Sequence, residues 1–251
     1  TSRRKVASRI TAVVEIVMID IKSIRDIERI EATPLAERNL PKSTYAAIAR
    51  TAQASPESFA IRFIENGETW REARDSGQVA LSRDITYAQL LSSINRTANL
   101  FRSLGMGDTD VVSILLPNIP EAYFALWGGE AAGIVNPINY LLDAKEIGEI
   151  VQSAGSKVLV IMGDHPGADI IAKLPVIRSH APCVQHVVVV GQAPLTAGPC
   201  LNFDEAISLQ IGDNFGTNLL CFCLQNRHLR FNQYNLWFLL SRDFFLCFLF
   251  I

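Results

Sequence analysis

Hydrophobic and polar positions recur at helical spacing over residues 86–104. Thr86 and Gln89 form a capping-box pattern at the start of this segment, and Gly105 follows its end. Apolar side chains recur three or four residues apart between these limits: Leu90, Leu91, Ile94, Ala98, Leu100, Phe101 and Leu104. The pattern therefore predicts an amphipathic helix that buries one face.

Short apolar runs follow this helix and predict buried strands. The runs at 111–116, 157–161 and 187–190 are rich in Val, Ile and Leu, and residues 134–135 are a shorter candidate. Helical segments separate them: Asn118 to Ala132, Asp143 to Ser153, and a segment within 168–178. Asn118 with Glu121 and Asp143 with Glu146 are the expected cap pairs, and Gly133 and Gly155 the expected ends.

The segment before this helix carries weaker signals. Residues 22–56 form a charged lead-in with a helix expected over 44–54. Residues 59–64 alternate weakly, as a strand does, and 65–68 are predicted to form a hairpin turn. The polar stretch 71–83 is predicted to be a loop.

Strands that alternate with helices predict an α/β fold. The connections are too long for hairpins, so they imply right-handed crossovers between parallel strands. Because the strands are apolar throughout, we expect helices on both faces of the sheet. The predicted architecture is a doubly wound, mostly parallel sheet, which binds ligands at the carboxyl ends of its strands.

Polar residues follow three of the predicted strands. Asn118 is expected to cap a helix, and Asn136 with Pro137 to shape a turn. Asp164 and His165 have no nucleophile beside them in the sequence, so a surface loop is expected there. Gly128-Gly129 is expected to allow close packing of the second helix.

Sequence motifs for nucleotide binding and hydrolysis are missing. Gly105 and Gly107 begin a G-x-G pattern, but Asp110 replaces the third glycine and a helix precedes the pair. Neither a phosphate-binding G-x-x-x-x-G-K-S/T nor a G-x-S-x-G elbow occurs. Cys221 and Cys223 with His228 lack zinc-site spacing, and His180 and His186 are scattered. We therefore assign no catalytic, cofactor-binding or metal-binding residue.

Charge and cysteine content narrow the functional classes. The net charge of −2 and the pI near 6.1 argue against a nucleic-acid binder, which needs a dense basic surface. Five cysteines without a regular framework favour reduced thiols and a cytoplasmic setting.

The composition changes abruptly near Gly216. Residues 217–251 contain no Ala, Val, Gly, Glu, Lys, Pro or Met, and nine of these thirty-five residues are aromatic, against twelve in the preceding 216. We therefore assign 216–251 as a hydrophobic, aromatic-rich tail foreign to the domain before it. Its apolar part, 236–251, includes Arg242 and Asp243 and is sixteen residues long. A spanning helix needs about twenty apolar residues, so membrane insertion is disfavoured, and an anchor stays an alternative.

The first residues carry a basic and then apolar pattern. Arg3, Arg4 and Arg9 precede an apolar run over 10–19, as in a signal or transit peptide. Glu15 interrupts the run and no small-residue cleavage site follows, so the favoured interpretation is an upstream extension with Met18 as the natural start. We assign residues 1–21 as this extension and 22–215 as the α/β domain.

The order and spacing of several segments resemble the adenylate-forming, AMP-binding acid–CoA ligases. These segments cover roughly residues 44–212 and are most similar to bacterial acyl-CoA synthetases of the fatty-acid or aryl-acid type. The matching segments are Ile85 to Leu90, Ala98 to Gly105, Gly107-Asp108, Val111 to Glu121, Gly129 to Gly133, Asn136 to Asn139, Glu146 to Ser153 and Lys157 to Ile161.

The resemblance implies a two-step reaction with ATP, Mg²⁺ and coenzyme A. A carboxylate attacks the α-phosphate of ATP, and the thiol of coenzyme A then displaces AMP. The family cradles the phosphates with a Ser/Thr/Gly-rich loop ending in Pro-Lys, which is expected shortly after Asp213. The tail stands there instead, so no catalytic residue is carried over. None of the three cofactors is expected to bind well to this chain.

Three hypotheses follow from the sequence. In the first, the chain is an incomplete amino-terminal part of the large domain of such a ligase, inactive alone. In the second, it is a non-catalytic α/β binding or regulatory module that pairs with a partner chain. In the third, the tail over 216–251 anchors it to a membrane. The acyl substrate and the oligomeric state stay open.

Overall fold

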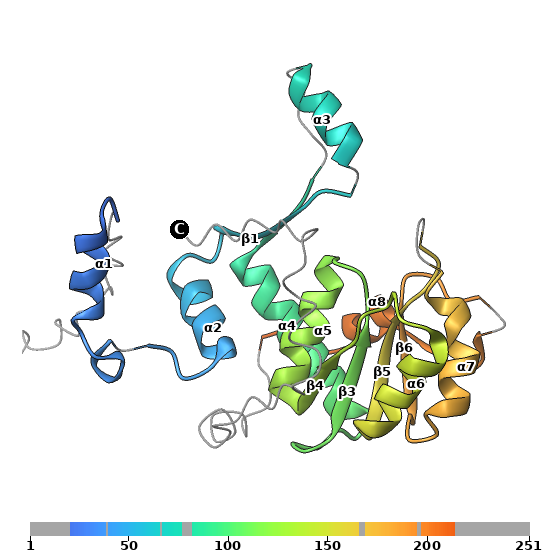
Figure 1. Cartoon of the computed structure of the whole chain (residues 1–251). Coiled ribbons are helices and arrows are strands. Elements are labelled where there is room, and N and C mark those ends of the chain that lie inside the picture. Colours follow the sequence, from blue (N-terminus) through green and yellow to red (C-terminus); the bar gives the residue numbers. More distant parts are fainter. Residues whose placement is uncertain are drawn as a thin grey trace, which may run out of the picture. The chain divides into compact units, whose positions relative to one another are not determined.

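The structure, a computed structural model, describes residues 21–213 apart from 39, 66, 77–81, 166–168 and 195–196. It confirms the α/β fold with a parallel sheet between two layers of helices (Figure 1). The predictions for residues 1–20 and for the tail lie outside the described residues. The assigned domain boundaries therefore stay predictions.

Five parallel strands form the main sheet in the order β4-β3-β5-β6-β7. The central strands are buried almost throughout, because both faces are covered. The strands are β3 (Val111–Leu115), β4 (Ile134–Pro137), β5 (Ser156–Met162), β6 (His186–Val190) and β7 (Leu201–Asn202).

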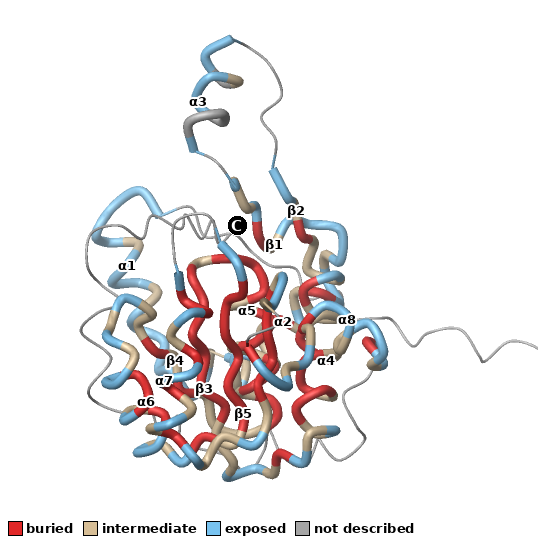
Figure 2. Tube along the Cα trace, turned by 90° about the vertical axis from the view of Figure 1, so that its right-hand side faces the viewer, coloured by how far each residue is buried: buried red, intermediate tan, exposed pale blue. Residues whose placement is uncertain are grey.

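Helices lie on both faces of this sheet, as the doubly wound prediction requires. Figure 2 shows α6 and α7 on one side of the strands and α4 and α8 on the other. On the second side α4 also packs against α5. The helices are α4 (Tyr87–Ser103), α5 (Pro120–Ala132), α6 (Ala144–Ser153), α7 (Leu174–His180), which follows the short turn η2 (Ile171–Lys173), and α8 (Phe203–Ser208). The chain changes direction after β4, because α6 carries it back across β3 to β5.

Two of the three predicted helix starts are confirmed. Thr86 and Gln89 form a reciprocal capping box at α4, and Asp143 and Glu146 do so at α6. The cap predicted at Asn118 is wrong, because α5 begins one residue later with Ile119 as N-cap. The fixed φ of proline suits the first helical position, and proline occupies it here.

The region before α4 differs from its prediction. The helix α2 (Thr44–Ala54) and the strand β1 (Phe59–Phe63) are confirmed, but no hairpin turn follows. Instead a helix, α3 (Gly67–Asp75), separates β1 from its antiparallel partner β2 (Arg83–Thr86). The sequence of α3 is rich in Glu and Arg, which favour helices, yet it lacks an apolar stripe that would reveal one.

Close packing between α5, α4 and the sheet depends on two adjacent glycines. A Cβ atom on Gly128 would lie 2.7 Å from the Thr97 Cβ. One on Gly129 would lie 2.7 Å from Val135 Cγ2. Both distances are below van der Waals contact, so the role predicted for Gly128-Gly129 in close helix packing is confirmed.

A buried polar network joins the three strands β4, β3 and β5. Asn136 Nδ2 donates to Ser113 Oγ at 3.0 Å, and the hydroxyls of Ser113 and Ser156 lie 2.6 Å apart. The turn predicted at Asn136 and Pro137 is therefore wrong, because both residues belong to β4. The prediction failed because Asn and Pro are common in turns, whereas here the amide has a hydrogen-bond partner in the sheet.

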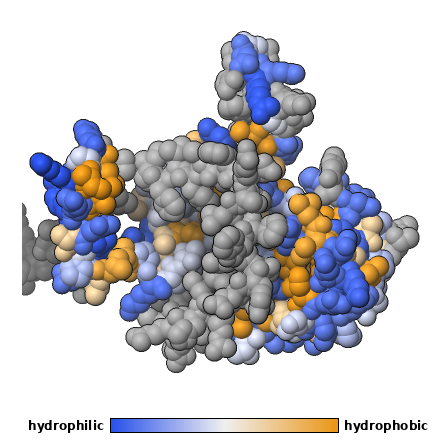
Figure 3. Space-filling model, in the orientation of Figure 1, coloured by the Kyte–Doolittle hydropathy of each residue, from blue (hydrophilic) through white to orange (hydrophobic). Residues whose placement is uncertain are grey.

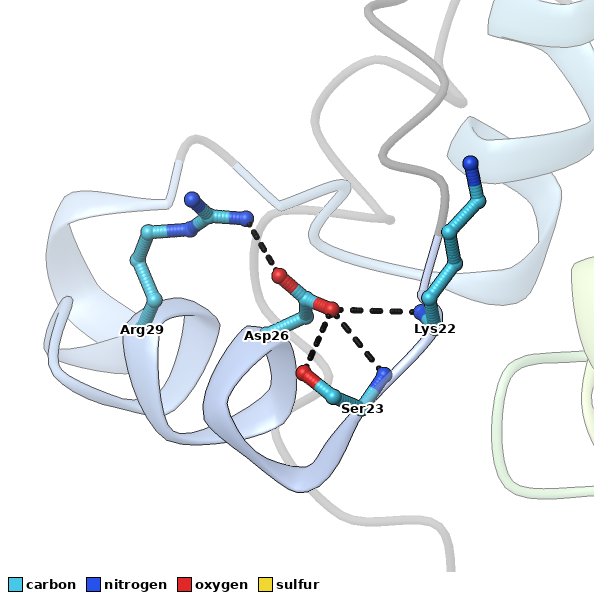
Figure 4. A network of polar contacts seen from close by, with 4 residues as sticks. All are labelled: Lys22, Ser23, Asp26 and Arg29. Carbon is cyan, nitrogen blue, oxygen red and sulfur yellow. Dashed lines mark hydrogen bonds and ion pairs between the residues drawn. The ribbon is translucent and has the colours of Figure 1, made fainter.

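Residues 21–40 form a separate unit with one α-helix, α1 (Ile24–Glu31), and a short turn, η1 (Leu35–Glu37). Figure 4 shows the Asp26 carboxylate at the start of α1, where it accepts hydrogen bonds from Ser23 and the Lys22 amide and pairs with Arg29. The Ser23 hydroxyl contributes most to lowering the pKa of Asp26. Apolar side chains, among them Ile24, are exposed on this helix (Figure 3).

Candidate functional site

The carboxyl ends of the parallel strands form the candidate site. In doubly wound sheets, ligands bind at the point where neighbouring strands connect to opposite faces. The strand β3 leads to α5 on one face, whereas its neighbours β4 and β5 lead to α6 and α7 on the other. The loops after β3, β4 and β5 therefore border the candidate site.

An amide and two aromatic rings lie after β3. Asn118 Oδ1 accepts a hydrogen bond from the Tyr123 hydroxyl at 2.7 Å. The rings of Tyr123 and Trp127 lie one turn apart on α5, with centroids 5.4 Å apart. Burial raises the pKa of the Tyr123 hydroxyl above its usual value, so this group stays a neutral donor at physiological pH.

A lysine fixes the loop after β4. Lys173 Nζ donates to the carbonyl oxygens of Tyr140 and Leu142, each at 2.7 Å. Within the loop, Asn139 Oδ1 accepts from the Leu141 amide at 3.0 Å, which is an Asx turn. The backbone of this loop is therefore held by its own Asx turn and by Lys173, whose ammonium donates to two carbonyl oxygens.

The loop after β5 is joined to the loop after β6. The Asp164 amide donates to Gln192 O at 2.9 Å. A Cβ atom on Gly163 would lie 2.0 Å from that same oxygen, so only glycine permits the approach. Asp164 and His165 are exposed, which confirms the surface loop predicted for them.

Three charged residues from β2, α5 and α8 meet near the start of α5. Arg83 Nη1 and Glu121 Oε1 are 2.5 Å apart, and the Glu121 side chain is nearly buried. Burial, followed by the charge of Glu121, raises the pKa of Asp204. The sequence reading missed this group because Arg83 lay in a predicted loop and Glu121 was assigned to a helix cap.

The described loops hold and orient backbone through the hydrogen bonds given above. Over residues 21–213, with the gaps named above, no cluster of three or more His, Cys, Asp or Glu side chains has the geometry of a metal site. The one lysine described above already donates to carbonyls. No reaction step is therefore derived through ATP or Mg²⁺ on these residues.

None of the helices described within residues 21–213 is long and apolar enough to span a bilayer. The apolar segment 236–251, which carried the anchor hypothesis, lies outside the described residues.

A family model described as "AMP-binding enzyme" matches residues 50–220, more than half of the chain. A marinolic acid–CoA ligase of Pseudoalteromonas sp. is 28% identical over 171 residues, which cover 68% of this chain and 25% of that protein. An acetyl-coenzyme A synthetase of Xanthobacter autotrophicus is 32% identical over 138 residues, which cover 51% of this chain and 21% of that protein.

A solved structure supports the fold. The coronafacic acid ligase of Pectobacterium brasiliense superposes with a TM-score of 0.55 at 16% identity, and the match covers 68% of this chain and 30% of that one. The matched part spans a quarter or less of the two curated relatives above.

Proposed function

The chain belongs to the AMP-binding enzymes, and from this membership we propose that it is the amino-terminal part of an ATP-dependent acid–CoA ligase. The observation that carries the proposal is the family match over residues 50–220, which contains the whole parallel sheet. The names of the two curated relatives, both of which join an acid to coenzyme A, support the reaction class.

The proposed reaction has two steps. A carboxylate oxygen attacks the α-phosphorus of ATP, so that pyrophosphate leaves and an acyl adenylate forms. The sulfur of coenzyme A then attacks the acyl carbon, and AMP leaves. The first step needs backbone donors and cations around the phosphates.

We propose that this chain alone does not carry out the first step. The loops after β3, β4 and β5 supply amide and hydroxyl groups, and the ammonium of Lys173 already donates to two carbonyls. In a ligase these loops would keep the backbone at the carboxyl ends of β3, β4 and β5 in place beside the substrate, while residues beyond 213 would bind the phosphates. A fatty-acid or aryl-acid substrate and a cytoplasmic location belong to the same proposal.

The coding sequence downstream of codon 213 tests this proposal. We expect another reading frame near that point to encode a Thr/Gly-rich loop ending in Pro-Lys, followed by the remainder of a ligase. If no frame encodes such a loop, the assignment of this chain to a ligase part loses its support, and the non-catalytic module becomes the better account.

A further inference from the structure

One face of α4 holds the segment that follows α8. Asn95 Nδ2 donates to Gly212 O at 2.9 Å, and Asn99 Nδ2 donates to Ile211 O at 2.8 Å. Arg96 Nη1 donates to Gln210 O at 3.0 Å and to Ser208 O at 3.2 Å. We call residues 208–212 the strap.

The α4 side chains bind the strap by its backbone. All four acceptors are main-chain carbonyl oxygens. The side chains of Leu209 and Ile211 point away from such contacts, since these residues are 84% and 69% exposed. Binding of the strap therefore depends little on which side chains it carries at those two positions.

A second helix sets the orientation of the central amide. The Tyr45 hydroxyl, from α2, donates to Asn95 Oδ1 at 2.9 Å. Because this oxygen accepts from Tyr45, the Nδ2 group of the same amide faces the Gly212 carbonyl. Asn95 is only 3% exposed, so water competes poorly for either hydrogen bond.

The strap also lies close to the side chains of α4 at its last position. A Cβ atom on Gly212 would lie 2.3 Å from Ser92 Oγ and 2.8 Å from Arg96 Nε. Gly212 is not among the glycines with positive φ, so glycine is favoured here by the close contact with the Ser92 and Arg96 side chains and not by a left-handed backbone.

The contacts also give the strap a direction. Ser208 and Gln210 both contact Arg96. From Ile211 to Gly212 the chain then passes from Asn99 toward Asn95 and Ser92, and so toward the first turns of α4. The last turn of α4 lies at the amino ends of the strands, because the loop after it leads into the start of β3. Gly133, at the end of α5, lies against the Asp110 carbonyl of that loop. The last step of the strap, from Ile211 to Gly212, thus runs toward the carboxyl ends of the strands.

We propose that Ser92, Asn95, Arg96 and Asn99 of α4 form a latch for the strap. The latch fixes the position and the direction of the chain at Gly212. It depends on the contacts described above and not on the ligase reaction.

Hydrogen–deuterium exchange of the full chain tests the latch. In Gly212→Ala and in Arg96→Ala, we expect the Leu209 and Gln210 amides, which donate to Ile207 O, to exchange about tenfold faster, because the strap is held to α4 by one or two fewer hydrogen bonds and opens more often. Arg96→Lys retains one donor group, so its strap amides are expected to exchange at a rate between those of the unmodified chain and of Arg96→Ala. Peptides from β5 and β6 should exchange as in the unmodified chain, which shows that each variant is folded.

Two further variants separate the latch from a general effect on the strap. Leu209→Ala changes an exposed side chain and should leave exchange of the strap unchanged. Ser92→Ala combined with Gly212→Ala removes the shortest steric contact and should restore part of the slow exchange. The latch is refuted if Gly212→Ala leaves strap exchange unchanged, or if Leu209→Ala accelerates it equally.

Discussion

Replacement of Ser113 by alanine should destabilise the fold more than replacement of Ser156. Ser113 Oγ lies at the centre of the buried network, because both Asn136 Nδ2 and the Ser156 hydroxyl contact it. Both serines are fully buried and Asn136 is 6% exposed, so water does not replace a lost partner. Ser113→Ala leaves two buried polar groups without this partner, whereas Ser156→Ala leaves Ser113 with the amide of Asn136.

The expected magnitudes follow from the number of groups affected. An unpaired buried donor or acceptor costs about 1–3 kcal/mol, so Ser113→Ala, which leaves two such groups, should lower the free energy of unfolding by about 2–6 kcal/mol. Ser156→Ala should cost about 1 kcal/mol, the typical net worth of one hydrogen bond. The exposed Ser179 offers a matched control, for which the change should stay within about 0.5 kcal/mol.

Urea denaturation followed by far-ultraviolet circular dichroism measures these differences as shifts of the midpoint at constant slope. The reasoning is refuted if Ser113→Ala and Ser156→Ala are equally destabilising, or if neither differs from Ser179→Ala. Either result would mean that the network contributes no more than exposed hydroxyls do.

Three other variants give further tests. Gly129→Ala should lower the free energy of unfolding by about 1–3 kcal/mol, because the added methyl group would overpack against Val135 and Val112. At Gly67 an added methyl group would meet no atom within 4 Å, so Gly67→Ala should leave the free energy of unfolding unchanged or raise it in the same urea assay. Burial raises the pKa of the Glu130 carboxyl above its ordinary value of 4.5, so the ionised form opposes folding. Glu130→Gln should therefore stabilise the fold at pH 7, and this gain should disappear as the pH falls below 4.5, where the carboxyl is protonated in both the folded and the unfolded chain. Thermal unfolding at several pH values measures the difference. Lys173→Met should accelerate amide exchange in the loop 139–142 but not in β6, and equal exchange in both would contradict its role in holding that loop.

The strands and helices from α4 to β6 could be predicted because their signals are local and strong. Apolar runs, the capping boxes at Thr86 and Asp143, and the glycine after α4 each act over a few residues, and the structure confirms them. The helix α3 could not be predicted in this way, since nothing in its polar sequence distinguishes it from a solvated loop.

Contacts between residues far apart in the sequence could not be predicted from local patterns. Arg83 and Glu121 are thirty-eight positions apart, and Asn95 and Gly212 are one hundred and seventeen apart. The sequence around Asn136 predicts a turn, because its hydrogen-bond partner Ser113 lies twenty-three positions earlier in the chain. Motifs of neighbouring residues cannot reveal such pairs, which explains why the polar contacts of the candidate site and of the latch emerged only from the structure.

The exchange of labelled pyrophosphate into ATP tests the proposed function most directly. The purified chain is incubated with Mg-ATP and a set of carboxylic acids that includes acetate, a medium-chain fatty acid and benzoate, and amide exchange of β5 and β6 confirms that it is folded. The account predicts no exchange above a control without the chain, because it assigns the phosphate-binding loop to another reading frame near codon 213. Exchange that depends on the chain and on one of the acids would contradict it.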